Sequence, residues 1–327
     1  MRYITKEIRI MEENWDYLIV LDACRYDYFS RVYQDYFQGK LSKVKSKGTG
    51  TFEWCTKSFK ERYDDVVYVS ANPYINSKHA TKDFQAKDHF YKIIDVWDWG
   101  WDKELGSVHP KEVNEATITT KAHNPDKRLI IHYLQPHAPY INYNISASGF
   151  PCPDVKEGRV LTGIHKNQSE DQKMAINNIP KGLENLLRIL GSITYLIDKK
   201  GFPMVNLEWK TREIFGLPAT SPMDAMRRKV GIHGLREAYL NNLRFVLEFV
   251  TELLESLSGI TVITADHGER LGEMGSYSHG SEIPDPLLYE VPWFEVSETK
   301  PRKLPKNDDE KRRIQKVIKE MKGVGVV

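Results

Sequence analysis

Four short runs of apolar residues stand out along the chain against a mostly polar background. They are Tyr17 to Leu21, Val66 to Ser70, Leu129 to Leu134 and Ile260 to Thr264. None shows the regular alternation of apolar and polar residues that is typical of a strand with one face in water. We therefore expect four strands that are covered on both faces, as in a parallel sheet.

A longer pattern with a different period lies between Leu235 and Leu257. Apolar residues recur there at steps of three and four, which places them on one face of a helix. They are Leu240, Leu243, Leu247, Val250 and Leu254. Helical patterns between buried strands favour an α/β fold, in which helices flank a doubly wound, mostly parallel sheet.

The chain divides by composition into a main body, an insertion and a tail. Residues 1–296 are expected to form one large domain, within which residues 142–234 are a partly helical insertion or lid. The clearest helical pattern in this insertion runs from Leu183 to Ile197. Residues 297–327 are rich in charged side chains, carry one short helical pattern from Asp308 to Met321, and are expected to be a solvated surface.

The composition is that of a soluble globular protein, with 40% hydrophobic and 28% charged residues. A net charge of +2 gives no strong overall field for nucleic acid, so no nucleic-acid partner is expected. No stretch is apolar enough for a signal peptide or a membrane span, which predicts a cytoplasmic location. The three cysteines, Cys24, Cys55 and Cys152, are too scattered for a disulfide framework or a structural zinc site.

Polar residues follow each of the four apolar runs. Asp22 comes directly after the first run, Asn72 follows the second, the segment from His132 to His137 closes the third, and Asp266 and His267 follow the fourth. Because the carboxyl ends of parallel strands meet at one edge of a sheet, we expect these side chains to gather there.

The adjacent pair Asp266 and His267 carries the most chemical information. A carboxylate and an imidazole at a strand end can bind one metal ion, and this mixture of oxygen and nitrogen ligands suits Zn²⁺ or Mn²⁺. His279 could return to the same place after a glycine-rich stretch. The alternative is that the pair only caps a loop.

The segment around this pair resembles a known family. The sequence DHGERLGEMGSYSHG is similar to the DHGE…LGE…HG signature of sulfatase-like and phosphoethanolamine-transferase-like enzymes, in the alkaline phosphatase/sulfatase-like superfamily. Two further segments, LIVLDACRYDYF and IHYLQPHAPY, resemble the first metal-binding strand and the central histidine segment of that superfamily, in the same chain order. The resemblance implies an alkaline-phosphatase-like catalytic domain.

Carried onto this sequence, the resemblance implies that Asp22, Asp266 and His267 hold one metal ion. It places His137 and His279 near the substrate or a second metal. His132 is a further candidate for that second position, although a histidine inside an apolar strand is equally well explained as a core imidazole bonded to the backbone.

The nucleophile is expected in the segment SKGTGTFEWCTKSF, between the first two strands. Formylglycine sulfatases need Cys or Ser in a C/S-x-P-x-R context, and Cys55 lacks both the proline and the arginine. Phosphoryl-transferring relatives use a threonine, and Thr51 lies after flexible glycines where a helix is expected to begin, with its hydroxyl placed to bind the metal as well. Thr49 stays an alternative nucleophile, and a simple capping role is the alternative for Thr51.

These residues predict a metal-dependent enzyme that acts on small-molecule or glycan-linked phosphate esters. Thr51 would form a covalent phosphothreonine, and His137 or His279 would stabilise charge or protonate the leaving group. Release to water gives a hydrolase, and release to an alcohol gives a transferase. The alternatives are a sulfatase and a non-catalytic protein that binds a phosphorylated or sulfated ligand.

Overall fold

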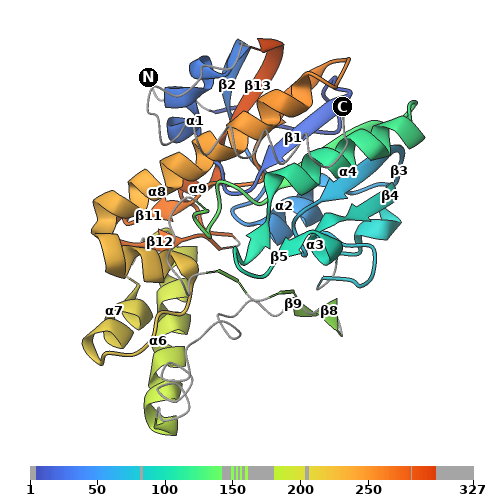
Figure 1. The fold of residues 1–327 in the computed structure, drawn as a ribbon. Helices are drawn as coiled ribbons and strands as arrows, with labels where there is room; N and C mark the ends of the chain where they lie inside the picture. Colours follow the sequence, from blue (N-terminus) through green and yellow to red (C-terminus); the bar gives the residue numbers. More distant parts are fainter. Residues whose placement is uncertain are drawn as a thin grey trace.

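A sheet of seven strands forms the centre of the computed structural model, which describes residues 5–81, 84–141, 149–150, 152–153, 155–156, 159–160, 180–202, 206–280 and 282–299 (Figure 1). The strand order is β2-β13-β10-β1-β7-β3-β4. The strands are β1 (Tyr17–Leu21), β2 (Phe37–Lys45), β3 (Tyr63–Ser70), β4 (Phe90–Asp95), β7 (Arg128–Tyr133), β10 (Thr261–Thr264) and β13 (Glu290–Thr299).

The sheet is mostly parallel, as the sequence predicted. The strands β10, β1, β7, β3 and β4 pair in parallel, and only β13 pairs antiparallel, with β10 on one side and β2 on the other. The four predicted apolar runs are β1, β3, β7 and β10. They lie next to one another at the centre of the sheet. The strands β2, β4 and β13, which the sequence did not predict, lie at its sides.

Helices cover both faces of the sheet, which confirms the doubly wound arrangement. Neighbouring residues of β7 point to opposite faces. The Tyr133 hydroxyl donates to Asn114 of α4 (Pro110–His123) at 2.5 Å on one face. On the other face the His132 ring lies 6.0 Å from Trp54 of α2 (Thr51–Ser58). Helices α1 (Tyr26–Val32) and α8 (Pro222–Leu254) lie on the same face as α4 and contact each other.

The long helix α8 begins earlier than the apolar pattern from Leu235 to Leu257 indicated. Its N-terminus is capped by the Ser221 hydroxyl, which accepts a hydrogen bond from the Asp224 N–H at 3.1 Å. Gly231 has a φ of 70°, and the helix bends there. The apolar periodicity becomes regular only after this bend, which explains why the sequence marked the second half alone.

The described part of the insertion contains two whole helices and the first part of α8. The whole helices are α6 (Lys181–Lys199), which contains the predicted helical pattern, and α7 (Leu207–Ile214). None of the helices that the structure describes is long and apolar enough to cross a membrane. The helical pattern from Asp308 to Met321 and residues 161–179 lie outside the described residues, and β13 runs on to Thr299, beyond the expected start of the tail.

The remaining elements are short and mostly connect the sheet to its helices. They are α3 (Val96–Trp99), α9 (Pro286–Tyr289), β5 (Trp101–Asp102), β6 (Ser107–Val108), β8 (Val155–Lys156), β9 (Arg159–Val160), β11 (Arg270–Leu271), β12 (Tyr277–Ser278), and the 3₁₀ turns Tyr33–Asp35, Ala86–Asp88 and Glu273–Gly275. The antiparallel pair β11–β12 matters most for function, because it directly follows the Asp266-His267 segment.

Candidate metal and nucleophile site

The polar residues that follow the central strands meet at one edge of the sheet, as the sequence predicted. Asn72, after β3, donates from its side-chain amide to the Asp22 carboxylate after β1 at 2.7 Å. Asp266, after β10, accepts from the backbone N–H groups of Ala23 and His267 at 3.1 and 2.9 Å. Backbone donors on one oxygen leave the other oxygen of Asp266 turned towards the site.

Thr51 joins this group from helix α2, which lies on the face of the sheet opposite α4. It is the first residue of α2, and its hydroxyl donates to the Asp266 Oδ2 at 2.7 Å and lies 3.3 Å from the His267 Nε2. The N-cap position belongs to Gly50, which has no side chain to cap the helix. The Thr51 hydroxyl is therefore directed into the site rather than onto the end of its own helix, contrary to the capping alternative.

Thr49 has a different environment from Thr51. Its hydroxyl lies 2.7 Å from the Gly280 carbonyl and 3.0 Å from the Glu53 carboxylate, and it accepts from the Ile283 N–H at 3.1 Å. These contacts tie the loop before α2 to the segment after β12. They turn Thr49 away from the carboxylates of Asp22 and Asp266.

Gly48 allows the chain to approach the start of α2 closely. A Cβ atom at this position would lie 2.3 Å from the backbone nitrogen of Trp54, a separation that real side chains do not reach. Glycine is therefore required here for packing, in addition to any flexibility that it gives the loop.

Three buried side chains at the strand ends have the chemistry of a cation site. Ligand atoms of Asp22, His132 and Asp266 all lie within 4.8 Å of one another. His132 Nε2 is 3.8 Å from Asp22 and 3.9 Å from Asp266, and has no hydrogen-bond partner among the residues that the structure describes. His267 Nε2 adds a fourth donor, 3.7 Å from Asp22 and 3.4 Å from Asp266. The donor set fits a divalent metal such as Zn²⁺ or Mn²⁺.

The pKa shifts of these side chains also favour a cation site. Burial, and then the charge of Asp266, raise the pKa of Asp22 well above its ordinary value. Burial lowers the pKa of both His132 and His267 to about 4, so each imidazole is neutral at neutral pH with a lone pair to offer. Two buried carboxylates beside neutral imidazoles form a site that a cation would stabilise.

A second cluster, His137, Glu269 and His279, adjoins the first. The Glu269 carboxylate lies 3.0 Å from the His279 Nδ1 and 3.8 Å from the His137 Nε2. The Glu269 Oε2 is buried, and within the described part of the chain it has no hydrogen-bond partner. The rings of His267 and His279 are 4.2 Å apart and join the two clusters. This second group could hold another cation or the polar part of a substrate.

The ion pair between Glu269 and His279 shifts the pKa of both residues. Burial alone would lower the pKa of His279, but the charge and hydrogen bond of Glu269 more than offset it, and the pKa is raised. Burial alone would raise the pKa of Glu269, and His279 instead lowers it. His279 is therefore the imidazole of the site that holds a proton most readily.

Two residues of this site were missed by the sequence analysis. Glu269 is the last residue of the DHGE segment, and only its burial with two histidines distinguishes it from an ordinary loop glutamate. Tyr68, inside β3, places its hydroxyl 2.8 Å from the Nδ1 of His132 and so fixes which ring nitrogen faces the carboxylates. Its signal in sequence was weak, because it lies in a run that was assigned to the core.

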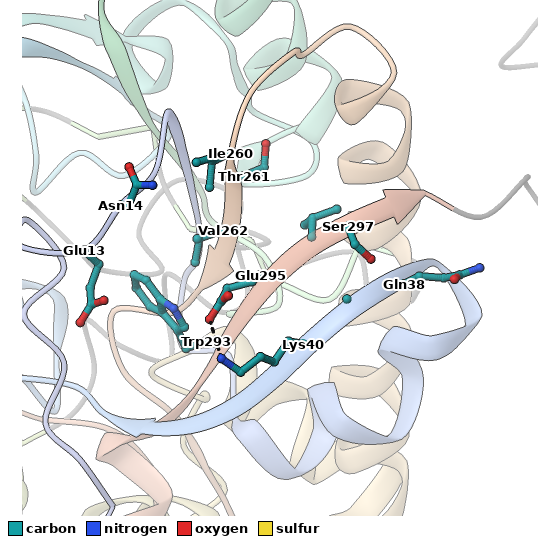
Figure 2. Close-up of a pocket in the computed structure, with 12 residues that line it drawn as sticks. Glu13, Asn14, Gln38, Lys40, Ile260, Thr261, Val262, Trp293, Glu295 and Ser297 are labelled. Carbon is teal, nitrogen blue, oxygen red and sulfur yellow. Dashed lines mark hydrogen bonds and ion pairs between the residues drawn. The ribbon is translucent and has the colours of Figure 1, made fainter.

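Two pockets lie outside this site. One, of about 660 Å³, lies where β10 begins, at the other end of the sheet, and Figure 2 shows Trp293 and the Lys40–Glu295 ion pair among its residues. The other, of about 520 Å³, is lined by the segment from Lys45 to Thr49 and by lysines of α2 and its C-terminal end. Neither pocket is lined by Thr51 or by the strand-end carboxylates.

Comparison with known proteins gives matches in structure alone. No family model and no curated protein sequence matches the chain. The similar solved structures include the integral membrane phosphoethanolamine transferase EptA of Neisseria meningitidis, at 14% identity and a TM-score of 0.43, over 90% of this chain and 51% of that one. This chain thus spans about half the length of that transferase.

Two further similar structures have low identity as well. The periplasmic domain of EptC from Escherichia coli, in complex with zinc, has 10% identity and a TM-score of 0.42, over 86% of this chain and 72% of that one. A proposed sulfatase of Bacteroides thetaiotaomicron has 10% identity and a TM-score of 0.45, over 86% of this chain and 64% of that one.

The prediction of a cytoplasmic location is wrong. Several of the similar structures are periplasmic domains, and one is an integral membrane protein. The prediction rested on the absence of a long apolar stretch, and such an absence does not determine a location. The sheet, the strand-end carboxylates and the order of the three resembling segments agree with one another, and they fit the fold that the resemblance to the alkaline phosphatase/sulfatase-like superfamily implied.

Proposed function

We propose that this protein is a metal-dependent hydrolase or transferase of phosphate esters that uses Thr51 as its nucleophile. The observation that carries the proposal is the position of the Thr51 hydroxyl, which is buried and lies 2.7 Å from Asp266 and 3.3 Å from His267. A structural threonine at the start of a helix would satisfy backbone groups, whereas this one is held by two groups that can bind a metal ion.

The residues proposed to hold the metal are Asp22, Thr51, Asp266 and His267, with His132 as a further donor. When bound, a divalent cation would neutralise phosphate oxygens and lower the pKa of the Thr51 hydroxyl. The protein contributes the orientation of each donor: Asn72 positions Asp22, two backbone N–H groups position Asp266, and the Gly268 carbonyl lies 2.8 Å from the Nδ1 of His267.

In the proposed reaction, the Thr51 Oγ attacks phosphorus opposite the leaving oxygen. The hydroxyl proton passes to Asp266, to which it is already hydrogen-bonded, and the N-terminus of α2 offers a favourable field to the phosphate. The bond between phosphorus and the leaving oxygen breaks as His279 donates its proton to that oxygen. Water or an alcohol then attacks the phosphothreonine while the neutral His279 takes up its proton. The bond between phosphorus and the Thr51 Oγ breaks, and Thr51 regains its proton from Asp266.

His137 is proposed to bind the substrate's polar groups beside His279. The two rings are 5.3 Å apart, and both side chains are partly exposed while Glu269 between them is buried. A partly exposed pair over a buried carboxylate can contact a ligand that enters from solvent. Either phosphate monoesters or diesters fit this arrangement.

The test compares wild type with Thr51→Ala on p-nitrophenyl phosphate, bis-p-nitrophenyl phosphate and p-nitrophenyl sulfate, with Zn²⁺ or Mn²⁺. Turnover of a phosphate ester is expected to fall by about a thousandfold or more in Thr51→Ala, because the attacking atom is gone. Adding glycerol as an acceptor separates the two outcomes, since a transferase then forms phosphoglycerol. Mass spectrometry of a quenched reaction should show phosphate on Thr51.

Thr56→Ala is the matched control, because Thr56 lies later on the same helix and its hydroxyl donates to the Glu53 carbonyl at 3.0 Å. It should keep its activity. Equal activity in wild type and Thr51→Ala would remove Thr51 as the nucleophile. Preferential turnover of the sulfate ester would favour the sulfatase alternative instead.

A further inference from the structure

Helix α6 exposes a stripe of large apolar side chains. Leu186, Ile189, Ile193 and Leu196 recur at steps of three and four, which places them on one side of the helix. All four are exposed, Ile189 to 55% and Leu196 to 60%. We call these four residues the apolar ridge. Phe202, just beyond the helix, is 67% exposed.

The packing of α6 does not account for the ridge. The helix buries a different side, which carries Leu187, Thr194 and Asp198. A helix of an ordinary globular protein turns its apolar side inwards and its polar side to water. Here the inward side is partly polar and the outward side carries four large apolar residues, so the ridge is suited to a surface outside the described part of the protein.

The ridge belongs to an element that extends away from the sheet but is firmly joined to the candidate site (Figure 1). Asp198 of α6 pairs with Arg270 of β11 at 3.0 Å, and Trp209 of α7 stacks on Tyr277 of β12 at 5.5 Å. The β11–β12 pair lies between Glu269 and His279. These two contacts connect α6 and α7 to the strands that lie between Glu269 and His279.

Basic side chains are exposed on the same segment as the ridge. Lys181, Arg188 and Lys200 of this segment are exposed, and Glu184 is the acidic residue exposed on the same helix. Asp198 is buried in its pair with Arg270. An apolar stripe edged by cations is the pattern of a helix that lies in the interface of a bilayer with anionic headgroups. A second copy of the chain would bring the same positive edge and repel it.

We propose that the apolar ridge of α6 docks on a membrane surface that contains anionic lipid, with the helix lying in the interface. The cations contact headgroups, and the ridge enters the boundary between headgroups and acyl chains. Docking would present the candidate site to esters carried at the membrane surface. The proposal does not depend on the proposed catalytic function, because binding can be measured without turnover.

The test is flotation of the full chain with vesicles of phosphatidylcholine alone and with about a quarter phosphatidylglycerol. Wild type should float with the anionic vesicles and less with neutral ones. The double variant Ile189→Glu/Ile193→Glu should bind on the order of tenfold more weakly, because two apolar side chains become charged. Both positions are exposed, so thermal unfolding of the variant should match wild type.

The matched control is Ile118→Glu on α4, an isoleucine that is 45% exposed on a helix outside the ridge. It should bind vesicles as wild type does. The proposal is overturned if wild type does not float, or if the ridge variant floats as well as the control. It is also overturned if light scattering shows that the ridge variant converts a wild-type dimer to a monomer while vesicle binding is unchanged, which would assign the ridge to a second copy of the chain.

Discussion

Tyr68 shows how one buried hydroxyl can determine the chemistry of a site that it does not enter. Its contact with the Nδ1 of His132 leaves the Nε2 facing Asp22 and Asp266. An imidazole that is held in this way loses less orientational freedom when it binds a metal. The orientation of His132 therefore depends on a residue of the next strand.

We expect Tyr68→Phe to weaken the binding of Zn²⁺ or Mn²⁺ by about tenfold, because His132 loses the partner that orients it. The ring stays in the core, so the fold should be kept. Isothermal titration with the metal measures the change. Tyr63→Phe, in the same strand, is the control and should bind metal normally; an unchanged affinity in Tyr68→Phe would show that His132 needs no such partner or does not bind the metal.

Glu53 connects two segments of the chain that lie on either side of the candidate site. Its carboxylate accepts hydrogen bonds from the Thr49 N–H at 2.9 Å and the Glu282 N–H at 2.7 Å, and it also pairs with Lys57. It thus joins the loop before α2 to the segment after His279. These contacts hold the two sides of the site together.

Glu53→Ala should lower the free energy of unfolding by about 2 kcal/mol, because the buried Thr49 N–H and the partly buried Glu282 N–H lose their acceptor. Urea denaturation followed by circular dichroism measures this. Glu61→Ala, an exposed glutamate, should change it little. A loss in Glu53→Ala no larger than in this control would mean that water replaces the carboxylate.

At this scale, site residues could be predicted from the sequence wherever chain position alone located a side chain. Asp22, Asp266, His267 and Thr51 were found because each stands at the end of a strand or the start of a helix, and the structure brings them together. Tyr68 and Glu269 could not be found in this way. Their importance depends on which side chain each one faces, and no local pattern encodes that.

Helix α4 begins with an unusual cap. The His109 ring accepts a hydrogen bond from the Lys111 N–H at 3.2 Å, and it packs edge-on against Phe245 and Phe249 of α8. Burial lowers the pKa of His109, and Lys111 adds to this while Asp102 opposes it. The cap therefore requires a neutral ring, because a protonated Nδ1 cannot accept.

This cap should make stability depend on pH. Above the pKa of an unfolded histidine, about 6.5, both states are neutral and the contribution of the cap is complete. As the pH falls, His109 takes up a proton in the unfolded chain before it does so in the folded protein. The free energy of unfolding therefore decreases until the pH reaches the lower pKa that His109 has in the folded state. Urea denaturation at pH 8 and at pH 5 should show the loss in wild type.

His109→Asn should reduce that loss, because the asparagine oxygen can still cap the helix but does not titrate. The difference between wild type and variant isolates His109 from the other histidines. His123→Asn, at the exposed end of the same helix, should leave the loss as it is in wild type. Identical pH dependence in wild type and His109→Asn would show that His109 does not contribute.

Elements were predicted well where burial was complete on both faces. The central strands β1, β3, β7 and β10 give unbroken apolar runs because helices cover both of their faces. At the sides, β2 contains Lys40, Lys43 and Lys45, and β13 contains Pro292 and several glutamates. Such strands pair through the backbone while much of their side-chain surface meets water, so the apolar pattern is lost.

On the scale of the whole molecule, a metal ion at the candidate site would tie the ends of β1, β7 and β10 together. Binding to the folded state alone stabilises it by mass action. Zn²⁺ or Mn²⁺ in hundredfold excess over its dissociation constant should raise the melting temperature by roughly 5 °C, and a chelator should reverse this.

Asp266→Asn should abolish the metal-dependent rise, because the residue is proposed to contribute a ligand and a charge. Asp64→Asn, at an exposed position, should keep it. Scanning calorimetry with and without metal distinguishes the two variants. No rise in wild type with either metal would contradict the cation site.

The pairing of β1 with β10 has a consequence for the synthesis of the protein. Tyr17 pairs with Thr261, so this partner of β1 is synthesised long after β1 itself. Until then one edge of β1 has no neighbour in the growing chain, and it must be kept from joining other nascent chains. The same delay keeps Asp22 from meeting Asp266, so the candidate site can assemble only after β10 has left the ribosome.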